Sequence, residues 1–219
     1  MTQIATPKVT SYDYDDVSNL DKVFLPNGIV TDYEYDNLNR VDKLTHYEPD
    51  ATPEDLSDNT KLAEYDYDVA ADGRRTGVTE TRYDSGTAES SRIDWTYDDL
   101  GRLTDEVFNH YDNLLDQTSH FTYDLSGNRL EQTLDKGNDS TIDEKVTYTF
   151  DDNDRMLTES NDSDNDGTVD TTTTYGYTAT EQTSKTVVDE ATGNTTSQTD
   201  YTYGRDGGGQ LFVDRSGHR

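Results

Sequence analysis

The sequence contains no cysteine, only two methionines and only four prolines among its 219 residues. The absence of cysteine excludes disulfides, zinc–thiolate sites and thiol nucleophiles, and leaves the redox compartment open. Leu, Ile, Val and Phe together make up about 17% of the chain, which is below the roughly 20% where disorder becomes a serious alternative. No stretch approaches the roughly 18 consecutive apolar residues of a membrane-spanning helix, and no export signal is visible at the N-terminus. These absences argue against a large aliphatic core and against membrane insertion.

Basic residues are also scarce. Eighteen Lys and Arg face 47 Asp and Glu, so the formal net charge is -29. Binding to a phosphate backbone requires clustered Lys and Arg, whereas here they stand singly among carboxylates, and we expect no nucleic-acid partner. Repulsion between carboxylates also opposes compaction. Composition and charge alone therefore favour a disordered chain, and a prediction of a fold needs further evidence from the sequence.

Aromatic residues, in contrast, occur at regular intervals. Of the 16 Tyr, 5 Phe and 1 Trp, most fall in eight pairs whose members are separated by one residue. The pairs are Tyr12/Tyr14, Tyr33/Tyr35, Tyr65/Tyr67, Trp95/Tyr97, Phe121/Tyr123, Tyr148/Phe150, Tyr175/Tyr177 and Tyr201/Tyr203. Successive second rings are 21, 32, 30, 26, 27, 27 and 26 residues apart, and an Asp follows directly in the first six pairs. Such self-similarity is typical of a repeat architecture and overturns the expectation of disorder.

The spacing within each pair predicts strands, because residues i and i+2 share one face of a strand and not of a helix. A polar residue such as Glu34 separates the rings, which predicts an aromatic face and a wet face. The segments 36–40, 98–102 and 151–155 then run from Asp to Arg, with Asn, Gly or Asp at the fourth position. Those three residue types accept a positive φ most readily. Each repeat therefore predicts a hairpin, and eight repeats predict roughly sixteen short strands.

These residues resemble the tyrosine-aspartate (YD) repeat of RHS proteins, most closely over Trp95–Leu103. The resemblance extends from about Tyr12 to Arg219. The residues that carry the repeat signature are Tyr33, Tyr35, Asp36, Arg40, Tyr65, Tyr67, Asp68, Trp95, Tyr97, Asp98, Gly101, Arg102, Tyr123, Asp124, Gly127, Arg129, Tyr148, Asp151 and Arg155. We expect them to have structural roles, because an exposed Asp–Arg pair contributes only about 0–1 kcal/mol and mainly fixes register.

The resemblance implies an all-β fold, in which tandem hairpins form a curved, spiralling antiparallel sheet like the shells of RHS-type and teneurin-type proteins. We expect residues 1–219 to form a single array, with degenerate units seven and eight over 171–219 and no separate catalytic or toxin domain. Eight units are too few to close a shell, which indicates a fragment or a degenerate copy. The resemblance also implies an extracellular or cell-envelope location, although no signal peptide is visible.

A second repeated feature lies between the aromatic pairs. The segments 112–116, 139–143 and 166–170 each begin and end with Asp, five residues before a pair. In the third, Asp162, Asp164, Asp166 and Asp170 give the alternating carboxylates of a calcium loop, with Gly167 at the turn. The EF-hand pattern fails at its twelfth position, which is Thr173 instead of Glu. Calcium binding is one hypothesis, and a solvated acidic turn is the simpler one.

Three functional classes follow from these observations. The first is a structural shell segment of a cell-surface or toxin-delivery protein, joined to further YD repeats or to a second copy through its sheet edges. The second is a calcium-assisted adhesion module whose rings bind glycans or extracellular matrix. The third, an enzyme, is disfavoured because an active site needs one asymmetric constellation and the candidate residues recur in every unit. We therefore predict no catalytic residues and no required cofactor.

Overall fold

The computed structural model describes residues 9–50, 52–84, 87–205 and 211–216, and it contains strands and no helix over these residues. The strands are β1 (Ser11–Tyr14), β2 (Leu20–Phe24), β3 (Val30–Tyr35), β4 (Val41–Tyr47), β5 (Lys61–Val69), β6 (Arg75–Asp84), β7 (Thr87–Tyr97), β8 (Leu103–Asn109), β9 (Gln117–Tyr123), β10 (Arg129–Lys136), β11 (Glu144–Phe150), β12 (Met156–Asp162), β13 (Thr171–Tyr177), β14 (Gln182–Asp189), β15 (Asn194–Arg205) and β16 (Leu211–Ser216). No segment of the described chain is a helix able to cross a membrane.

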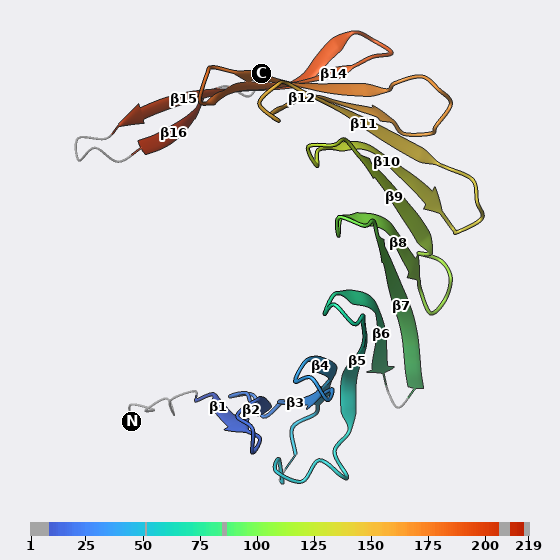
Figure 1. Ribbon diagram of the computed structural model, residues 1–219, viewed down its shortest axis with the longest axis vertical. Coiled ribbons are helices and arrows are strands. Elements are labelled where there is room, and N and C mark those ends of the chain that lie inside the picture. Colours follow the sequence, from blue (N-terminus) through green and yellow to red (C-terminus); the bar gives the residue numbers. More distant parts are fainter. Residues whose placement is uncertain (1–8, 51, 85–86, 206–210, 217–219) are drawn as a thin grey trace, which may run out of the picture. The chain divides into compact units, whose positions relative to one another are not determined.

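The strands lie in one sheet in chain order, from β1 to β16, and Figure 1 shows each strand beside its neighbour in the sequence. Every strand pair with a defined register, such as β3 with β4 and β11 with β12, is antiparallel. The sheet is open, because β1 and β16 stand at the two ends of the order. The prediction of an all-β fold built from about sixteen strands in tandem hairpins is confirmed.

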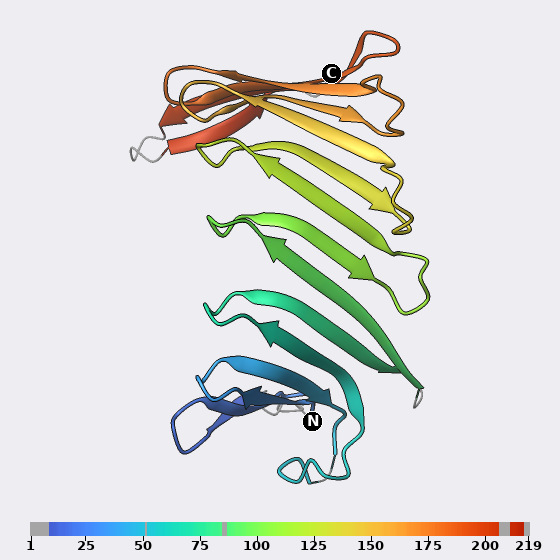
Figure 2. The same ribbon diagram turned by 45° about the vertical axis from the view of Figure 1, so that its right-hand side comes forward.

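The chain forms two compact units. Unit 1 contains Met1–Thr96 and Glu106–Asp116, and unit 2 contains Tyr97–Asp105 and Gln117–Arg219. Each unit consists of consecutive hairpins whose strands are linked alternately by short turns and by longer loops, and Figure 2 shows both kinds of connection. The run Gly207–Gly209 in the degenerate unit eight lies outside the described residues.

The short turns owe their shape to the residues after each aromatic pair. In the turn 36–40 the Asn39 amide donates to the Asp36 carbonyl at 3.0 Å, and the Asp36 amide donates to the Arg40 carbonyl at 2.9 Å. The fourth residue has a positive φ, 58° at Asn39 and 81° at Gly101, as its identity predicts. A register shift at Glu34/Tyr35 marks a β-bulge, which usually accompanies a turn that ends in this conformation.

The core is thin, with few fully buried side chains among the described residues. Val30 in β3 and Thr45 in β4 are the most deeply buried side chains, at 0% and 2% exposure. The paired rings from Tyr33 to Tyr177 are half-buried, and Tyr148 is buried. In four of these six strands the residue between the two rings is exposed, namely Glu34, Asp66, Thr96 and Thr149. This alternation gives the sheet the aromatic face and the wet face that the pair spacing predicts.

Candidate functional site

The Asp–Arg turns form a repeated site at one end of the strands. In the turn 98–102 one carboxylate oxygen of Asp98 accepts the backbone amides of Leu100 and Arg102, both at 2.9 Å. The other oxygen accepts Nε of Arg102 at 2.7 Å. The backbone and side-chain hydrogen bonds from Arg102 lower the pKa of Asp98 below its usual value. Asp36 with Arg40 and Asp151 with Arg155 repeat this geometry.

The same arginines also connect one turn to the next. Arg40 Nη1 donates to the carbonyl of Ala70 at 2.7 Å, and Arg155 Nη1 donates to that of Thr178 at 2.6 Å. Arg102 Nη1 likewise donates to the carbonyl of Asp124 at 2.7 Å. Each acceptor is the first residue of the following turn. The guanidinium therefore closes its own turn and also attaches the neighbouring repeat.

Several of the paired rings have a Lys or Arg side chain over them. Arg102 lies 4.8 Å from the ring centroid of Tyr123, and Arg155 lies 4.7 Å from that of Tyr177. Similar contacts join Arg75 to Tyr67, Arg129 to Phe121 and Tyr148, and Lys185 to Tyr175. The Tyr123 hydroxyl donates to the Leu103 carbonyl at 2.7 Å, and Tyr35 makes the same contact with Leu20 at 2.8 Å. These rings are tied into the sheet by both their faces and their hydroxyl groups.

Two signature residues lie elsewhere than the repeat pattern suggests. Asp68 follows its aromatic pair but belongs to β5, and its carboxylate accepts Nη2 of Arg92 at 2.5 Å. The turn of that unit starts two residues later, at Ala70, and ends at Arg74. In unit five Asn128 occupies the position of the turn arginine, so Arg129 stacks on rings and makes no turn pair. A longer strand β5 and one inserted residue explain the two differences.

The remaining signature residues keep to the pattern. Tyr33, Tyr65 and Tyr97 are half-buried on their strands, and the Trp95 indole donates to Glu106 at 2.8 Å. Gly127 has a φ of 98°, which glycine accepts without strain.

The acidic loop 163–170 connects β12 to β13 at the opposite end of the strands. Asp162, Asp164 and Asp166 offer carboxylate oxygens within 4.8 Å of one another, and Asp170 does not join them. The Asp170 carboxylate accepts the amide of Ser163 at 2.7 Å and its hydroxyl at 2.5 Å, which lowers the pKa of Asp170.

The buried Asp162 is already engaged with the backbone of this loop. Its two oxygens accept the amides of Asp166 at 3.1 Å and Gly167 at 2.9 Å. Asp135 plays the same part in the preceding loop, where it accepts the amides of Asp139 at 3.1 Å and Ser140 at 2.8 Å. These hydrogen bonds stabilise the loops without a metal ion. Calcium binding by the loop 163–170 stays a prediction.

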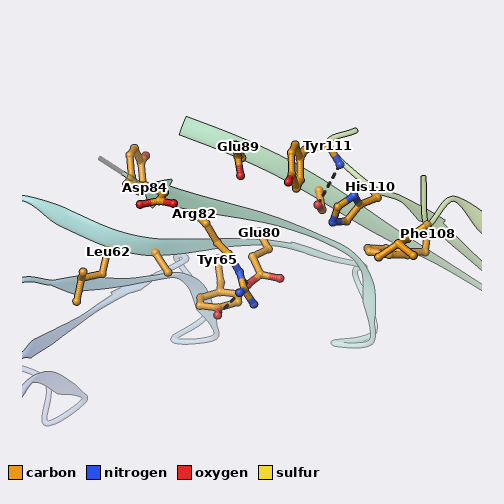
Figure 3. A pocket seen from close by; sticks show the side chains of 13 residues that line it. Leu62, Tyr65, Glu80, Arg82, Asp84, Glu89, Phe108, His110 and Tyr111 are labelled. Atoms are coloured by element: carbon orange, nitrogen blue, oxygen red, sulfur yellow. Dashed lines mark hydrogen bonds and ion pairs between the residues drawn. The ribbon is translucent and has the colours of Figure 1, made fainter. Parts of the chain in front are cut away.

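A cavity in unit 1 was not anticipated from the sequence. It has a volume of about 830 Å³ and borders β5, β6, β7, β8 and the segment after β8. Its lining combines rings such as Tyr65 and Tyr111 with the carboxylates of Glu80 and Glu89, as Figure 3 shows. Glu80 accepts the hydroxyl of Tyr65 at 3.1 Å and Nε of Arg82 at 2.7 Å. Only the pairing register between neighbouring strands brings these residues together, so no local motif could have revealed them.

The fold and its turns define an open, all-β array of tandem hairpins. No family model matches the sequence, and no curated protein matches it either. Among solved structures, the chain resembles the crystal structure of TcdB2-TccC3-TEV, with a TM-score of 0.55 at 11% identity, covering 94% of this chain and 11% of that chain. The crystal structure of TcdB2-TccC3 gives a TM-score of 0.55 at 11% identity, covering 94% and 12%. A structure of the Photorhabdus luminescens Tc holotoxin pore with the TccC3 mutation D651A gives a TM-score of 0.30 at 13% identity, covering 94% and 13%.

The likeness to TcdB2-TccC3 shows a shared fold. The present chain spans about one eighth or less of the length of those chains.

Proposed function

We propose that this chain is a non-enzymatic structural segment of an RHS-type shell, carried by a cell-surface or toxin-delivery protein outside the cell or in the cell envelope. The observation that carries the proposal is the link from three turn arginines, Arg40, Arg102 and Arg155, to the next turn, such as Arg102 to the Asp124 carbonyl at 2.7 Å. A link of this kind extends an array one repeat at a time. The likeness to part of TcdB2-TccC3, over 94% of this chain, supports the same reading.

The edge strand β1 supports an attachment to further repeats. Its rings Tyr12 and Tyr14 are 55% and 63% exposed, whereas the paired rings from Tyr33 to Tyr177 are half-buried or buried. A strand added beside β1 would cover these rings and use the backbone groups of the edge. The partner in this proposal is another YD repeat, in the same protein or in a second copy.

The proposal is tested by the coding sequence on either side of this chain and by electron microscopy of the complete product. We expect further aromatic pairs spaced by 21 to 32 residues, as within this chain, and a hollow particle. A flanking sequence without such pairs, together with a 219-residue chain that stays monomeric, contradicts the shell. Saturable binding on a glycan array would favour the adhesion module, and hydrolysis that depends on one carboxylate would favour an enzyme.

A further inference from the structure

The cavity of unit 1 takes no part in linking the turns. Its lining comes from the four consecutive strands β5 to β8 and the segment that follows β8, and Figure 3 shows Tyr65, Glu80 and Arg82 on one side of the space with Glu89 and Tyr111 on the other. At about 830 Å³ it lies within the usual range of roughly 300–1,000 Å³ for ligand pockets. Ligand pockets usually combine aromatic side chains with a few polar or charged groups, and this lining has both.

The charge of this cavity is negative. Three carboxylates line it, those of Glu80, Asp84 and Glu89, and one guanidinium, that of Arg82. Arg82 is already paired with Glu80 at 2.7 Å, so the carboxylates that line the cavity outnumber its guanidinium groups. The carboxylate of the half-buried Glu89 has no hydrogen bond or ion pair within the described part of the chain. Glu89 also raises the pKa of the neighbouring Tyr111 through its negative charge.

The described rings of the protein fall into two groups, those with a Lys or Arg of the chain over them and those without. Tyr67, Tyr123, Tyr148, Tyr175 and Tyr177 each have a Lys or Arg of the chain over them. Tyr83 at the border of the cavity has Lys61, at 5.9 Å. Over residues 9–50, 52–84 and 87–201, no Lys or Arg of the chain stacks on Tyr65 or Tyr111. Tyr65 instead meets the edge of His46 at 6.1 Å, and Tyr111 lies 4.3 Å from His110.

From this juxtaposition we propose that the cavity binds a basic peptide segment, with an Arg or Lys side chain placed against the rings of Tyr65 and Tyr111 and beside the carboxylate of Glu89. The guanidinium or ammonium group would repeat the ring–cation contact that the protein makes within its own sheet. The cavity is larger than one such group requires, so it can also accept the residues on either side. The inference is independent of whether the chain belongs to a shell.

The test is calorimetric titration of the complete chain with the peptide Ac-Arg-Gly-Arg-Gly-Arg-NH₂ at physiological ionic strength. The matched probe is the same peptide with citrulline in place of arginine, which keeps the shape and removes the charge. We expect saturable binding of the arginine peptide and at least tenfold weaker binding of the citrulline peptide, because both the ring contact and the carboxylate contact require charge. Equal binding of the two peptides overturns the proposal.

Variants separate the cavity from the general negative charge of the protein. Glu89→Gln should weaken binding about fivefold or more, and Tyr111→Leu about threefold or more, each through the loss of one contact. The matched control is Glu34→Gln, which makes the same charge change at an exposed position in β3 of the same unit. Equal weakening by Glu89→Gln and Glu34→Gln would show attraction to net charge alone and would overturn the site. Tighter binding of spermine than of the peptide would contradict a peptide ligand and would indicate a free polyamine instead.

Discussion

In unit 2, the turns at one end of the strands and the loops at the other end satisfy their backbone N–H groups in different ways. At one end, in the turns 98–102 and 151–155, an Asp accepts two backbone amides and also pairs with an Arg. At the other end, Asp135 and Asp162 lie at the ends of β10 and β12, next to the loops 137–143 and 163–170. They accept backbone amides of these loops without an Arg partner. Both ends use carboxylates to satisfy backbone N–H groups, but only the first neutralises their charge.

The difference shows how the carboxylates of the two ends take part in the connection between repeats. At the turn end, the Arg that pairs with the Asp also reaches the carbonyl of the next turn, so closing a turn and linking it to the next repeat depend on the same side chain. At the loop end, Asp135 and Asp162 bind backbone amides of their own loops, and the contact between these loops is made by another residue, Asn165, whose side chain donates to the Ile142 carbonyl at 2.9 Å. Substitutions at the two ends should therefore have effects of different kinds, local in the loops and shared between repeats at the turns.

The largest effect should come from Asp162→Ala in the acidic loop. Two backbone amides would lose their acceptor beside a residue that is only 7% exposed, and each buried unsatisfied donor costs about 1–3 kcal/mol. The free energy of unfolding from urea titration should fall by about that amount. The neighbouring Asp164→Ala is the control, because the one bond of that carboxylate is long, at 3.3 Å to the Asp166 amide. Equal losses in the two variants would show that Asp162 does not hold the loop.

A somewhat smaller effect is expected from Arg102→Ala at the turn end. The substitution removes the bond to the Asp124 carbonyl and the contact with the Tyr123 ring, together worth about 1–2 kcal/mol. Hydrogen exchange should accelerate in both turns, 98–102 and 124–128, because the link is shared. Arg82→Ala, at a 72% exposed side chain, is the control and should change neither turn. Faster hydrogen exchange in the turn 98–102 alone would contradict the proposed coupling between the two turns.

Acid should weaken the turn end through Asp98. Its pKa is lower in the folded chain than in the unfolded one, so its stabilising effect is complete above the unfolded value of about 3.9 and is lost as pH falls through the folded value. The neutral variant Asp98→Asn should melt at a lower temperature than the native protein at pH 7. The two melting curves should converge between about pH 5 and pH 2. A gap in melting temperature that stays constant over this range would contradict the assignment.

The smallest effect is expected from calcium at the acidic-loop end. Because Asp162 already binds two amides and Asp170 lies outside the cluster, we expect at most weak calcium binding, with a Kd near the millimolar range of about 10⁻⁴–10⁻³ M. Calorimetry at physiological ionic strength should show that Asp164→Asn removes this binding. Asp139→Asn, in the preceding loop, should leave it unchanged. No heat at millimolar calcium would leave the loop as a solvated acidic turn.

Much of the fold could be predicted from the sequence, because each turn is encoded locally. The i, i+2 rings predict the faces of the strands, and Asn39, Gly101 and Asp154 predict the positive φ that closes each turn. Two local differences escaped the pattern. Asp68 lies in a longer strand, and Asn128 takes the position of the turn arginine, because strand length and single insertions change the register without changing the motif.

The cavity of unit 1 could not be predicted in the same way. Tyr65 faces Glu80 because β5 and β6 pair in one particular register, and Glu89 reaches the same place through the pairing of β6 with β7. A hairpin with a longer connection can shift by two residues and keep the same alternation of faces. The sequence therefore indicates which side chains share a face but not which of them meet.

The acceptor of the turn arginine has a further consequence for how such arrays can evolve. Arg40 and Arg155 reach the carbonyls of Ala70 and Thr178, the first residues of two turns that do not begin with Asp. Every amino acid brings a main-chain carbonyl, so a diverged repeat still offers a docking point to the intact repeat before it. Mutations in one unit are thus buffered by its neighbour, and the array can drift far in sequence while it keeps its architecture.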